Sequence, residues 1–334
     1  MFFFSIFFFF SFSNVFGDVP EGSWILGLEP DYQIPKDNPP TQEKVLLGKR
    51  LFFDKRLSLD ESMSCATCHV PEKGFSNAME VAEGVSGVKG SRNVPSVVNR
   101  LFGQAQFWDG RSETLESQAV GPLLNPDEMG INEVLLTERL KAYPEYQTLF
   151  QKAFNSAPTL ENVSKAIASF ERTLITGESL FDRYEWNGET DALSASAKRG
   201  LTLFRGKARC SMCHIGTNFT DENFHNIGAG AEEGRKDPGR MQVTKDSVDS
   251  GKFKTPTLRN ITLTAPYMHD GSIATLEDVI AFYDRGGGPN PNLDKEIKPL
   301  KLTDQEKADL LAFLKSLTGP VISVNVEDLK ARTQ

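Results

Sequence analysis

Two short stretches of the sequence carry cysteine and histidine in the same spacing, C-x-x-C-H. They are Cys65, Cys68 and His69, and then Cys210, Cys213 and His214. Together they use all four cysteines of the chain. This spacing occurs in redox dithiols, in halves of zinc sites and in c-type haem attachment sites. Any assignment must therefore account for a site that occurs twice.

The surroundings of the cysteines separate these alternatives. A thioredoxin-like dithiol belongs in a β-α-β pattern, whereas the flanks here have helical periodicity. A compact zinc module keeps its two cysteine pairs within about 15–20 residues, and these pairs are much farther apart. Two disulfides remain an alternative in an exported chain. Because the full spacing occurs twice, we predict two covalently bound c-type haems, with His69 and His214 as iron ligands.

The N-terminal residues indicate export. The first seventeen, MFFFSIFFFFSFSNVFG, are almost all phenylalanine and small residues, and they fall short of the about 20 apolar residues of a membrane span. We predict a signal peptide (residues 1–17) cleaved after Gly17, and hence a periplasmic protein. An uncleaved membrane anchor is the alternative, because the stretch lacks a basic residue. A net charge of −8 and a pI near 5.2 argue against nucleic acid as a partner.

The sequence also indicates an internal duplication of a helical unit. Related text, LGKRLFFDKRLSLDESMSCATCH and AKRGLTLFRGKARCSMCH, leads into both C-x-x-C-H stretches. Each predicts a basic amphipathic helix with a Leu-Phe pair, then a short loop. Chance similarity of short helices is the alternative. We predict two cytochrome c-like haem domains, residues 18–180 and 181–334, which agrees with the two-domain prior for 334 residues.

Helical periodicity dominates the rest of the chain. LENVSKAIASFERTLI places Val163, Ile167, Phe170 and Leu174 on one helical face. Thr303 and Glu306 have the spacing of a capping box, which predicts a second helix from there to the Gly-Pro at 319–320. Strand patterns are scarce. We therefore predict a mainly α fold with few short strands.

An ordered set of motifs then resembles one family. The motifs are GFSN, RNVPSVVN, QFWDGR, QAVGPLLNPDEMG, AIASFERTLITGESLFDRY and TPTLRNITLTAPYMHDGSIATLEDVI. They resemble the bacterial di-haem cytochrome c peroxidases and their relative MauG, from about residue 24 to residue 319. The resemblance implies that peroxide reacts at the N-terminal haem and that the C-terminal haem relays electrons. Reduction of peroxide to water takes two electrons, and a second haem can supply one of them.

The resemblance also implies which iron is open. Many family peroxidases carry a distal histidine in the Gly-rich loop where this chain has Val85. Since valine cannot bind iron, we predict that the His69 haem is five-coordinate or carries only water; a long loop that brings His225 over is the alternative. At the His214 haem, Tyr283 stands where the classical peroxidases have a methionine and where MauG has a tyrosine. Met268 is the alternative ligand, and Tyr283 could also be an ordinary buried tyrosine.

The family match implies further site residues. Gln118 and Glu128 are placed in the peroxide pocket, whose shape Pro122 limits, and Glu128 is the expected acid and base. On sequence alone, Glu128 would be a surface carboxylate of a turn. Trp108 is placed between the haems, as an electron relay or as packing. A calcium ion is implied at the Asn93 side chain and the backbone carbonyls of Thr264 and Pro266.

Three functions follow, from two classes. The first is a cytochrome-c peroxidase that reduces hydrogen peroxide with electrons from a small cytochrome c or a cupredoxin. The second is a MauG-like enzyme that oxidises a residue of a partner protein, which Tyr283 favours. The third is a non-catalytic electron-transfer cytochrome, against which Val85 argues. A homodimer is compatible with each of them.

Overall fold

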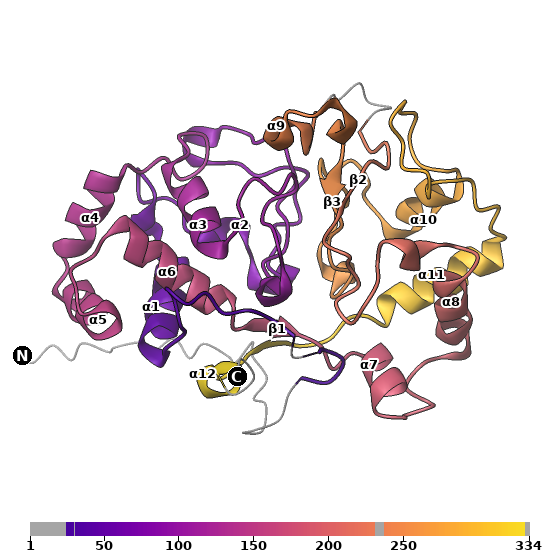
Figure 1. The fold of residues 1–334 in the computed structure, drawn as a ribbon, viewed down its shortest axis with the longest axis horizontal. Coiled ribbons are helices and arrows are strands. Elements are labelled where there is room, and N and C mark those ends of the chain that lie inside the picture. The colour runs from indigo at the N-terminus through magenta and orange to yellow at the C-terminus, as the bar shows by residue number, and fades with distance from the viewer. Residues whose placement is uncertain (1–24, 30, 231–236, 331–334) are drawn as a thin grey trace, which may run out of the picture.

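The computed structural model describes residues 25–29, 31–230 and 237–330. The predicted signal peptide therefore lies outside the described residues. Figure 1 shows two helical lobes side by side, the first built from the N-terminal half and the second from the C-terminal half. The named strands of the described part form two antiparallel pairs, β1 with β4 and β2 with β3. The prediction of a mainly α fold with few short strands is confirmed.

In its described residues, the first lobe contains six α-helices and one strand. They are α1 (Gln42–Phe52), α2 (Cys65–Cys68), α3 (Leu115–Leu124), α4 (Glu133–Lys141), α5 (Pro144–Phe154), α6 (Leu160–Glu171) and β1 (Leu174–Thr176). The second lobe contains α7 (Leu180–Trp186), α8 (Ala195–Arg205), β2 (Phe224–His225), α9 (Met241–Thr244), β3 (Phe253–Lys254), α10 (Leu276–Asp284) and α11 (Asp304–Lys315). The chain ends with β4 (Val321–Ser323) and α12 (Val326–Lys330).

The same helix crossing occurs in both lobes. Gly48 of α1 lies so close to α6 that a Cβ on it would be 1.9 Å from the carbonyl oxygen of Ala166. Gly200 of α8 meets the carbonyl oxygen of Asp309 in α11 at the same 1.9 Å. Only glycine permits backbones to approach this closely. The repeated crossing supports the internal duplication inferred from the sequence.

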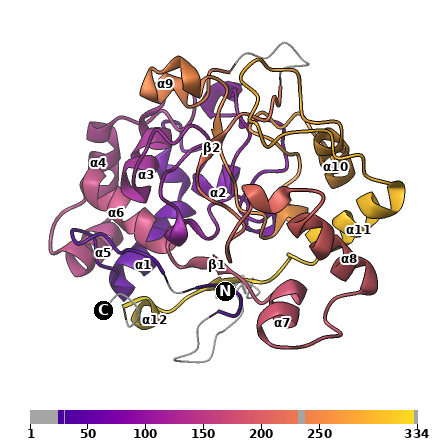
Figure 2. The ribbon, with the colours of Figure 1, turned by 45° about the vertical axis from the view of Figure 1, so that its right-hand side comes forward.

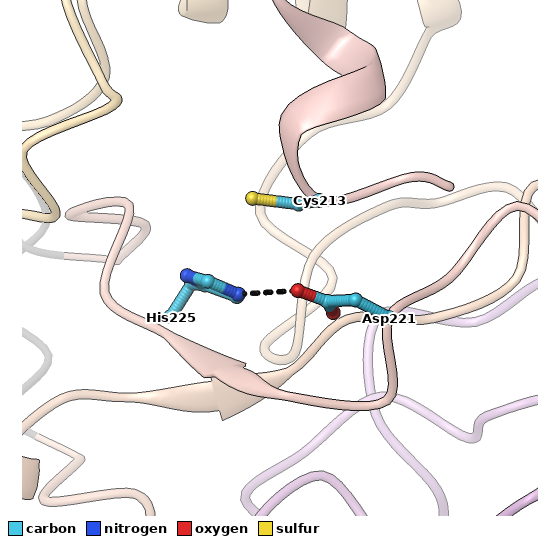
Figure 3. A group of neighbouring side chains, drawn as sticks. All are labelled: Cys213, Asp221 and His225. Carbon is cyan, nitrogen blue, oxygen red and sulfur yellow. Dashed lines mark hydrogen bonds and ion pairs between the residues drawn. The ribbon is translucent and has the colours of Figure 1, made fainter. Parts of the chain in front are cut away.

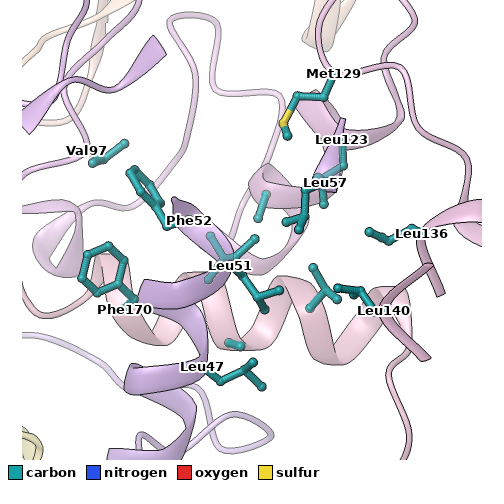
Figure 4. Close-up of a cluster of buried hydrophobic side chains, with 14 of the residues drawn as sticks. Leu47, Leu51, Phe52, Leu57, Val97, Leu123, Met129, Leu136, Leu140 and Phe170 are labelled. Carbon is teal, nitrogen blue, oxygen red and sulfur yellow. The ribbon is translucent and has the colours of Figure 1, made fainter. Parts of the chain in front are cut away.

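Each lobe has its own hydrophobic core. In the first lobe, Leu51 and Phe52 of α1 pack with Phe170 of α6 and with leucines of the surrounding helices, as Figure 4 shows. In the second lobe, Phe204 of α8 and Phe313 of α11 pack with their ring centroids 5.0 Å apart. Both residues of the predicted Leu-Phe pair are thus buried on α1, whereas on α8 Phe204 is buried and Leu203 is partly buried.

Two predicted helices end earlier than expected. α11 ends at Lys315, before the Gly-Pro at 319–320 to which the sequence extends it. Val163, Ile167 and Phe170 are buried on α6, but Leu174 lies in β1, where it pairs with Ser323 of β4. The prediction that Leu174 continues the helical face is therefore wrong. The backbone of the 174–176 segment instead forms ladder hydrogen bonds with a strand that follows it by almost half the chain.

The C-terminal segment returns to the first lobe. Val326 of α12 belongs to the first lobe's core, and Figures 1 and 2 both place α12 beside α1. Leu329 joins a small third cluster with Ile25, and its carbonyl accepts from the Tyr32 hydroxyl at 2.9 Å. The division at residue 180 stays a prediction, and residues 321–330 pack on the lobe that precedes it. No helix within the described ranges has the length and hydropathy of a membrane span.

Candidate active site

A single cavity of about 1290 Å³ is lined by both C-x-x-C-H stretches. Its walls come from α3, α6, α10 and α11 and from the loops around residues 80–111 and 253–269. Cys65, Cys68 and His69 lie in the part formed by the first lobe, and Cys210, Cys213 and His214 lie in the part formed by the second. The two sites therefore share one cavity between the lobes.

The first site is fixed by a one-turn helix. α2 carries both cysteines, and His69 directly follows it, with its backbone N–H bonded to the carbonyl of Cys65. The ring Nδ1 of His69 lies 3.0 Å from the carbonyl oxygen of Phe75. Because a carbonyl only accepts, Nδ1 carries the proton, and Nε2 is left as the coordinating atom. Burial also lowers the pKa of His69, which favours the neutral ring that a metal needs.

The second site repeats this arrangement. Cys210 begins a short 3-10 helix (Cys210–Met212), and the Nδ1 of His214 lies 2.9 Å from the carbonyl oxygen of Phe219. Burial lowers the pKa of His214 as well. Each site thus offers two thiols and one oriented imidazole nitrogen facing a cavity. This donor set fits a c-type haem at each stretch.

Glu128 faces the first site from the turn after α3. Its Oε1 accepts a hydrogen bond from the Nδ2 of Asn125 at 2.9 Å. Burial raises the pKa of the Cys68 thiol, and the nearby Glu128 carboxylate raises it further. Gln118 and Pro122, one turn apart on α3, line the same wall. The structure thus brings Gln118, Pro122 and Glu128 together beside the first stretch.

Val85 lies in a loop that is hydrogen-bonded to the turn containing Glu128. Its backbone N–H donates to the carbonyl of Glu128 at 2.8 Å, and its side chain is 5% exposed within the first lobe's core. The described cavity wall here is made by Glu83 and Gly84, and Val85 is not part of it. Position 85 offers no side-chain nitrogen that could bind an iron at this site. The open iron itself stays a prediction.

Tyr283 lies on the cavity-facing side of α10, together with Leu276 and Ile280. Burial, followed by the nearby Cys210 and Cys213, raises the pKa of its phenol. Met268 lines the cavity too, with φ at +75°. Both candidates for the sixth ligand of the second haem are thus in the cavity, and the choice between them stays a prediction.

The two remaining histidines have other contacts. His269 stacks on Phe253, with ring centroids 3.6 Å apart. His225 holds a carboxylate at each ring nitrogen, Asp294 at 2.6 Å and Asp221 at 2.9 Å. Since His225 lies beside the second stretch, the alternative in which it reaches the first haem finds no support in this geometry.

Figure 3 shows His225 with Asp221 and the sulfur of Cys213. Ligand-type atoms of these three residues lie within 4.8 Å of one another, as in a metal site. A Cys213 sulfur that forms a thioether with a porphyrin carries no negative charge, however, and it is then a poor metal ligand. This group therefore belongs to the second haem site.

Trp108 lies where the lobes exchange backbone hydrogen bonds. Its carbonyl accepts from the N–H of Lys254 at 2.8 Å, and the carbonyl of His269 accepts from the N–H of Asn93 at 2.7 Å. The indole Nε1 of Trp108 donates to the carbonyl of Asn93 at 2.9 Å. Trp108 is thereby fixed at the junction, on the cavity wall.

The three residues of the implied calcium site also line the cavity. Asn93 is 6% exposed, and its Nδ2 donates to the carbonyls of Met79 at 2.8 Å and Glu80 at 3.2 Å. Its Oδ1 is therefore the atom that can face a cation. Thr264 and Pro266 lie on the second lobe's side of the same wall. Oxygen donors of this kind fit calcium, which stays a prediction.

Comparison with known proteins decides the family. The family described as "Di-haem cytochrome c peroxidase" matches residues 42–191, and the cytochrome c family matches residues 197–318. The methylamine utilization protein MauG of Methylorubrum extorquens is 45% identical over 299 residues, which cover 88% of this chain and 84% of MauG. The chain belongs to the di-haem cytochrome c peroxidase and MauG family. Its two cytochrome c domains imply two c-type haems.

Relatives within the di-haem family carry both names. A cytochrome-c peroxidase, IdrP1, of a Pseudomonas species is 38% identical over 320 residues, covering 86% of this chain and 84% of that protein. The crystal structure of a MauG-like protein associated with microbial copper homeostasis matches with a TM-score of 0.82 and 35% identity, over 93% of this chain and 99% of that one. The family's members are peroxidases or MauG-type oxidoreductases, so an oxidoreductase activity is supported.

Two residues of the di-haem site were not predicted from the sequence. Asn125 donates a hydrogen bond to Glu128, but in the sequence its pattern indicates only the start of an NPDE turn. The sequence predicts that Glu171 is a polar residue at the end of a helix, yet it is 3% exposed and lines the cavity. Comparison of the two halves position by position could have identified Glu171, because its counterpart in the second half is a leucine.

Proposed function

We propose that this chain is a periplasmic peroxidase that reduces hydrogen peroxide to water with electrons from a small redox protein. The observation that carries the proposal is the Glu128 carboxyl, which is held by Asn125 in the cavity beside the first C-x-x-C-H stretch. Cys65, Cys68 and His69 would hold the haem at which peroxide binds, and Cys210, Cys213, His214 and Tyr283 would hold the electron-storing haem. The two haems supply the iron and the stored electrons.

Glu128 provides the proton chemistry in this proposal. The bond from Asn125 occupies Oε1, so Oε2 is the oxygen that exchanges a proton with substrate. It takes the proton of the inner peroxide oxygen and delivers it to the outer one, which leaves as water. Two electrons and two further protons complete the reduction to two water molecules. Gln118 orients the peroxide from the adjacent wall.

The test uses the purified protein with both haems attached. We expect it to consume hydrogen peroxide while it oxidises a reduced small cytochrome c, and we expect Glu128→Gln to lower this rate by about 10²–10⁴-fold, because general acid-base catalysis contributes that much. The matched control is Glu133→Gln, an exposed carboxylate in the first turn of α4 that does not line the cavity, and it should keep the wild-type rate. A Glu128→Gln variant of wild-type activity would refute the role of Glu128, and a six-coordinate low-spin spectrum from both haems would refute the open site.

Tyr283 supports a second candidate, a MauG-like oxidation of a partner protein. A phenolate ligand stabilises oxidised iron relative to a thioether, which makes stronger oxidants accessible. Tyr283→Phe should change the spectrum of the second haem alone, whereas Met268→Ala should leave it unchanged. Peroxide consumption that occurs only when a partner protein is modified would favour this candidate over the general peroxidase.

A further inference from the structure

A buried carboxyl faces the first haem site from a direction that the proposed mechanism does not use. Glu171 ends α6, one turn after Ile167, and both side chains line the cavity. Its side chain is 3% exposed, and its Oε2 has no hydrogen-bond partner among the described residues. Such a group destabilises the folded protein, because burial removes its hydration without supplying a hydrogen bond in return.

The duplication shows that this carboxyl is specific to the first site. Gly48 of α1 packs against Ala166 and Phe170 of α6. Gly200 of α8 packs in the same way against Asp309 and Phe313 of α11. One position further along each helix stand Glu171 in the first lobe and Leu314 in the second, and both line the cavity. The second site is therefore complete with a leucine at this place. The helix crossing does not require the carboxyl.

The two arginines near Glu171 form ion pairs with other carboxylates. The guanidinium of Arg172 donates to both oxygens of Glu116 on α3, at 2.6 and 2.8 Å. The guanidinium of Arg100 donates to both oxygens of Glu222, at 2.9 and 3.0 Å.

The buried cation of the first helix is also paired elsewhere. Lys44 of α1 is turned to Asn38 and to the carbonyl of Pro39, at 3.1 and 2.9 Å. With the neighbouring arginines paired elsewhere, burial dominates at Glu171. The pKa of its carboxyl is raised to about 8, against the lowering effects of Arg172 and Arg100 and with a further raising effect from Glu116. On the cavity side, Cys65 of α2 is close enough for the two side chains to interact electrostatically. At neutral pH the group is a neutral acid that carries an exchangeable proton beside the first attachment site.

We propose that Glu171 is a proton-holding residue of the first haem site, which releases its proton when this site loses an electron and recovers it when the site regains one. The inference rests on haem attachment at Cys65 and Cys68, as proposed above. Reduction of one hydrogen peroxide to two water molecules takes two electrons and two protons, and the first site gives one of these electrons while the second site gives the other. As the first site gives its electron, the O–H bond at Glu171 breaks, and the proton passes to water. The carboxylate then balances the added positive charge. An electron from the redox partner and a proton from water restore the acid.

The test is a redox titration of the haem-loaded protein, followed by absorption, at a series of pH values. Loss of one proton with one electron lowers the midpoint potential by about 59 mV per pH unit, because a tenfold change in a one-electron equilibrium corresponds to that shift. We expect this slope for the first haem around neutral pH, and a flat potential well above about pH 8, where Glu171 has lost its proton in both redox states. Glu171→Gln should remove most of the slope, since the amide keeps the shape but holds no titratable proton.

Two further variants separate this role from a structural one. Glu171→Leu copies Leu314 of the second lobe and should also give a first haem with a flat potential. Glu161→Gln makes the same chemical change at an exposed carboxylate of the same helix, and it should retain the wild-type slope. An unchanged slope in Glu171→Gln and Glu171→Leu would overturn the proposal.

An infrared difference spectrum provides a readout besides the potential. Oxidation of the wild-type protein should remove the C=O band of one protonated carboxyl, and Glu171→Gln should lack this change. The absence of that band in the wild-type protein would also overturn the proposal. These measurements need no peroxide turnover, so a failure of the peroxidase proposal and a failure of this inference are distinguishable.

Discussion

We expect Asn125 to act on the chemistry through Glu128, because its Nδ2 donates to one carboxylate oxygen of Glu128 at 2.9 Å. A hydrogen bond to a charged group contributes about 1.5–3 kcal/mol, so we expect Asn125→Ala to lower the rate of peroxide reduction about tenfold or somewhat more. If Asn125 serves only to position Glu128, its loss should have little effect once Glu128 is already Gln. Steady-state rates of the two single variants and the double variant measure this coupling. Multiplying effects in the double variant would show that Asn125 acts independently of Glu128.

Single residues of the site differ in how far the sequence reveals them. The cysteines and histidines of the two sites are recognisable because haem attachment imposes a fixed local spacing, all within five residues. Asn125 and Glu171 have no such spacing. The bond between Asn125 and Glu128 spans only three residues, but the sequence does not show that this turn faces the cavity. At Glu171 the role depends on cations that are already paired with carboxylates of distant segments.

At the level of helices, the two glycine crossings set how closely the paired helices pack. A Cβ at Gly48 or at Gly200 would lie 1.9 Å from a backbone oxygen of the opposite helix, which must then move. We expect Gly48→Ala and Gly200→Ala each to reduce the free energy of unfolding by about 1–3 kcal/mol, the usual range for overpacking, although alanine favours the helix itself. Denaturant titration of the haem-loaded protein measures the loss.

A matched control exists for this prediction. At Gly90 an added Cβ would lie 3.6 Å from the nearest atom, the carbonyl oxygen of Ala82, which is an ordinary contact. Gly90→Ala should therefore change the free energy of unfolding by less than either helix variant. Equal losses at all three positions would mean that the close approach of the helices is not the cause.

Helix α11 and the end of α6 show why some elements are predictable and others are not. The capping box at Thr303 and Glu306 is a local signal, and the helix begins where it predicts. Leu174 continues a helical pattern in the sequence, yet it lies in β1 because β4, far along the chain, offers it a ladder partner. The signal that ends α6 is therefore not local, and periodicity could not reveal it.

At the scale of the whole molecule, Glu222 joins the two lobes. It belongs to the second lobe and pairs with Arg100 of the first, while its Oε2 also accepts from the N–H of Gln104 at 3.1 Å. Although burial opposes it, the charges of Arg100 and Lys254 lower the pKa of Glu222 to about 2. The carboxylate therefore stabilises the folded state above its unfolded pKa, and this contribution is lost as the pH falls towards the folded value.

Glu222→Gln should accordingly destabilise the protein at neutral pH by about 3 kcal/mol, because it leaves buried cations without their partner. The difference from the wild type should shrink as the pH falls from about 5 towards about 2, because the carboxyl of the unfolded state takes up a proton in this range while that of the folded state is still ionised. Urea titrations across this range measure it. The control is Glu327→Gln, whose side chain is 76% exposed in its pair with Lys330 and which should have little effect at any pH. A difference independent of pH would contradict the assignment to the charge.

The junction that Glu222 stabilises also holds Trp108, whose indole donates to the carbonyl of Asn93 while its own carbonyl accepts from Lys254 of the other lobe. If Trp108 relays electrons, Trp108→Phe should slow electron transfer between the haems severalfold, since phenylalanine packs similarly but is harder to oxidise. Stopped-flow absorption of the half-reduced protein after mixing with hydrogen peroxide measures this rate. Trp186→Phe, at a tryptophan that is 54% exposed on α7, controls for the loss of an indole elsewhere. An unchanged rate in Trp108→Phe, with both haem spectra intact, would leave Trp108 as packing between the sites and would mean that electrons cross the junction without it.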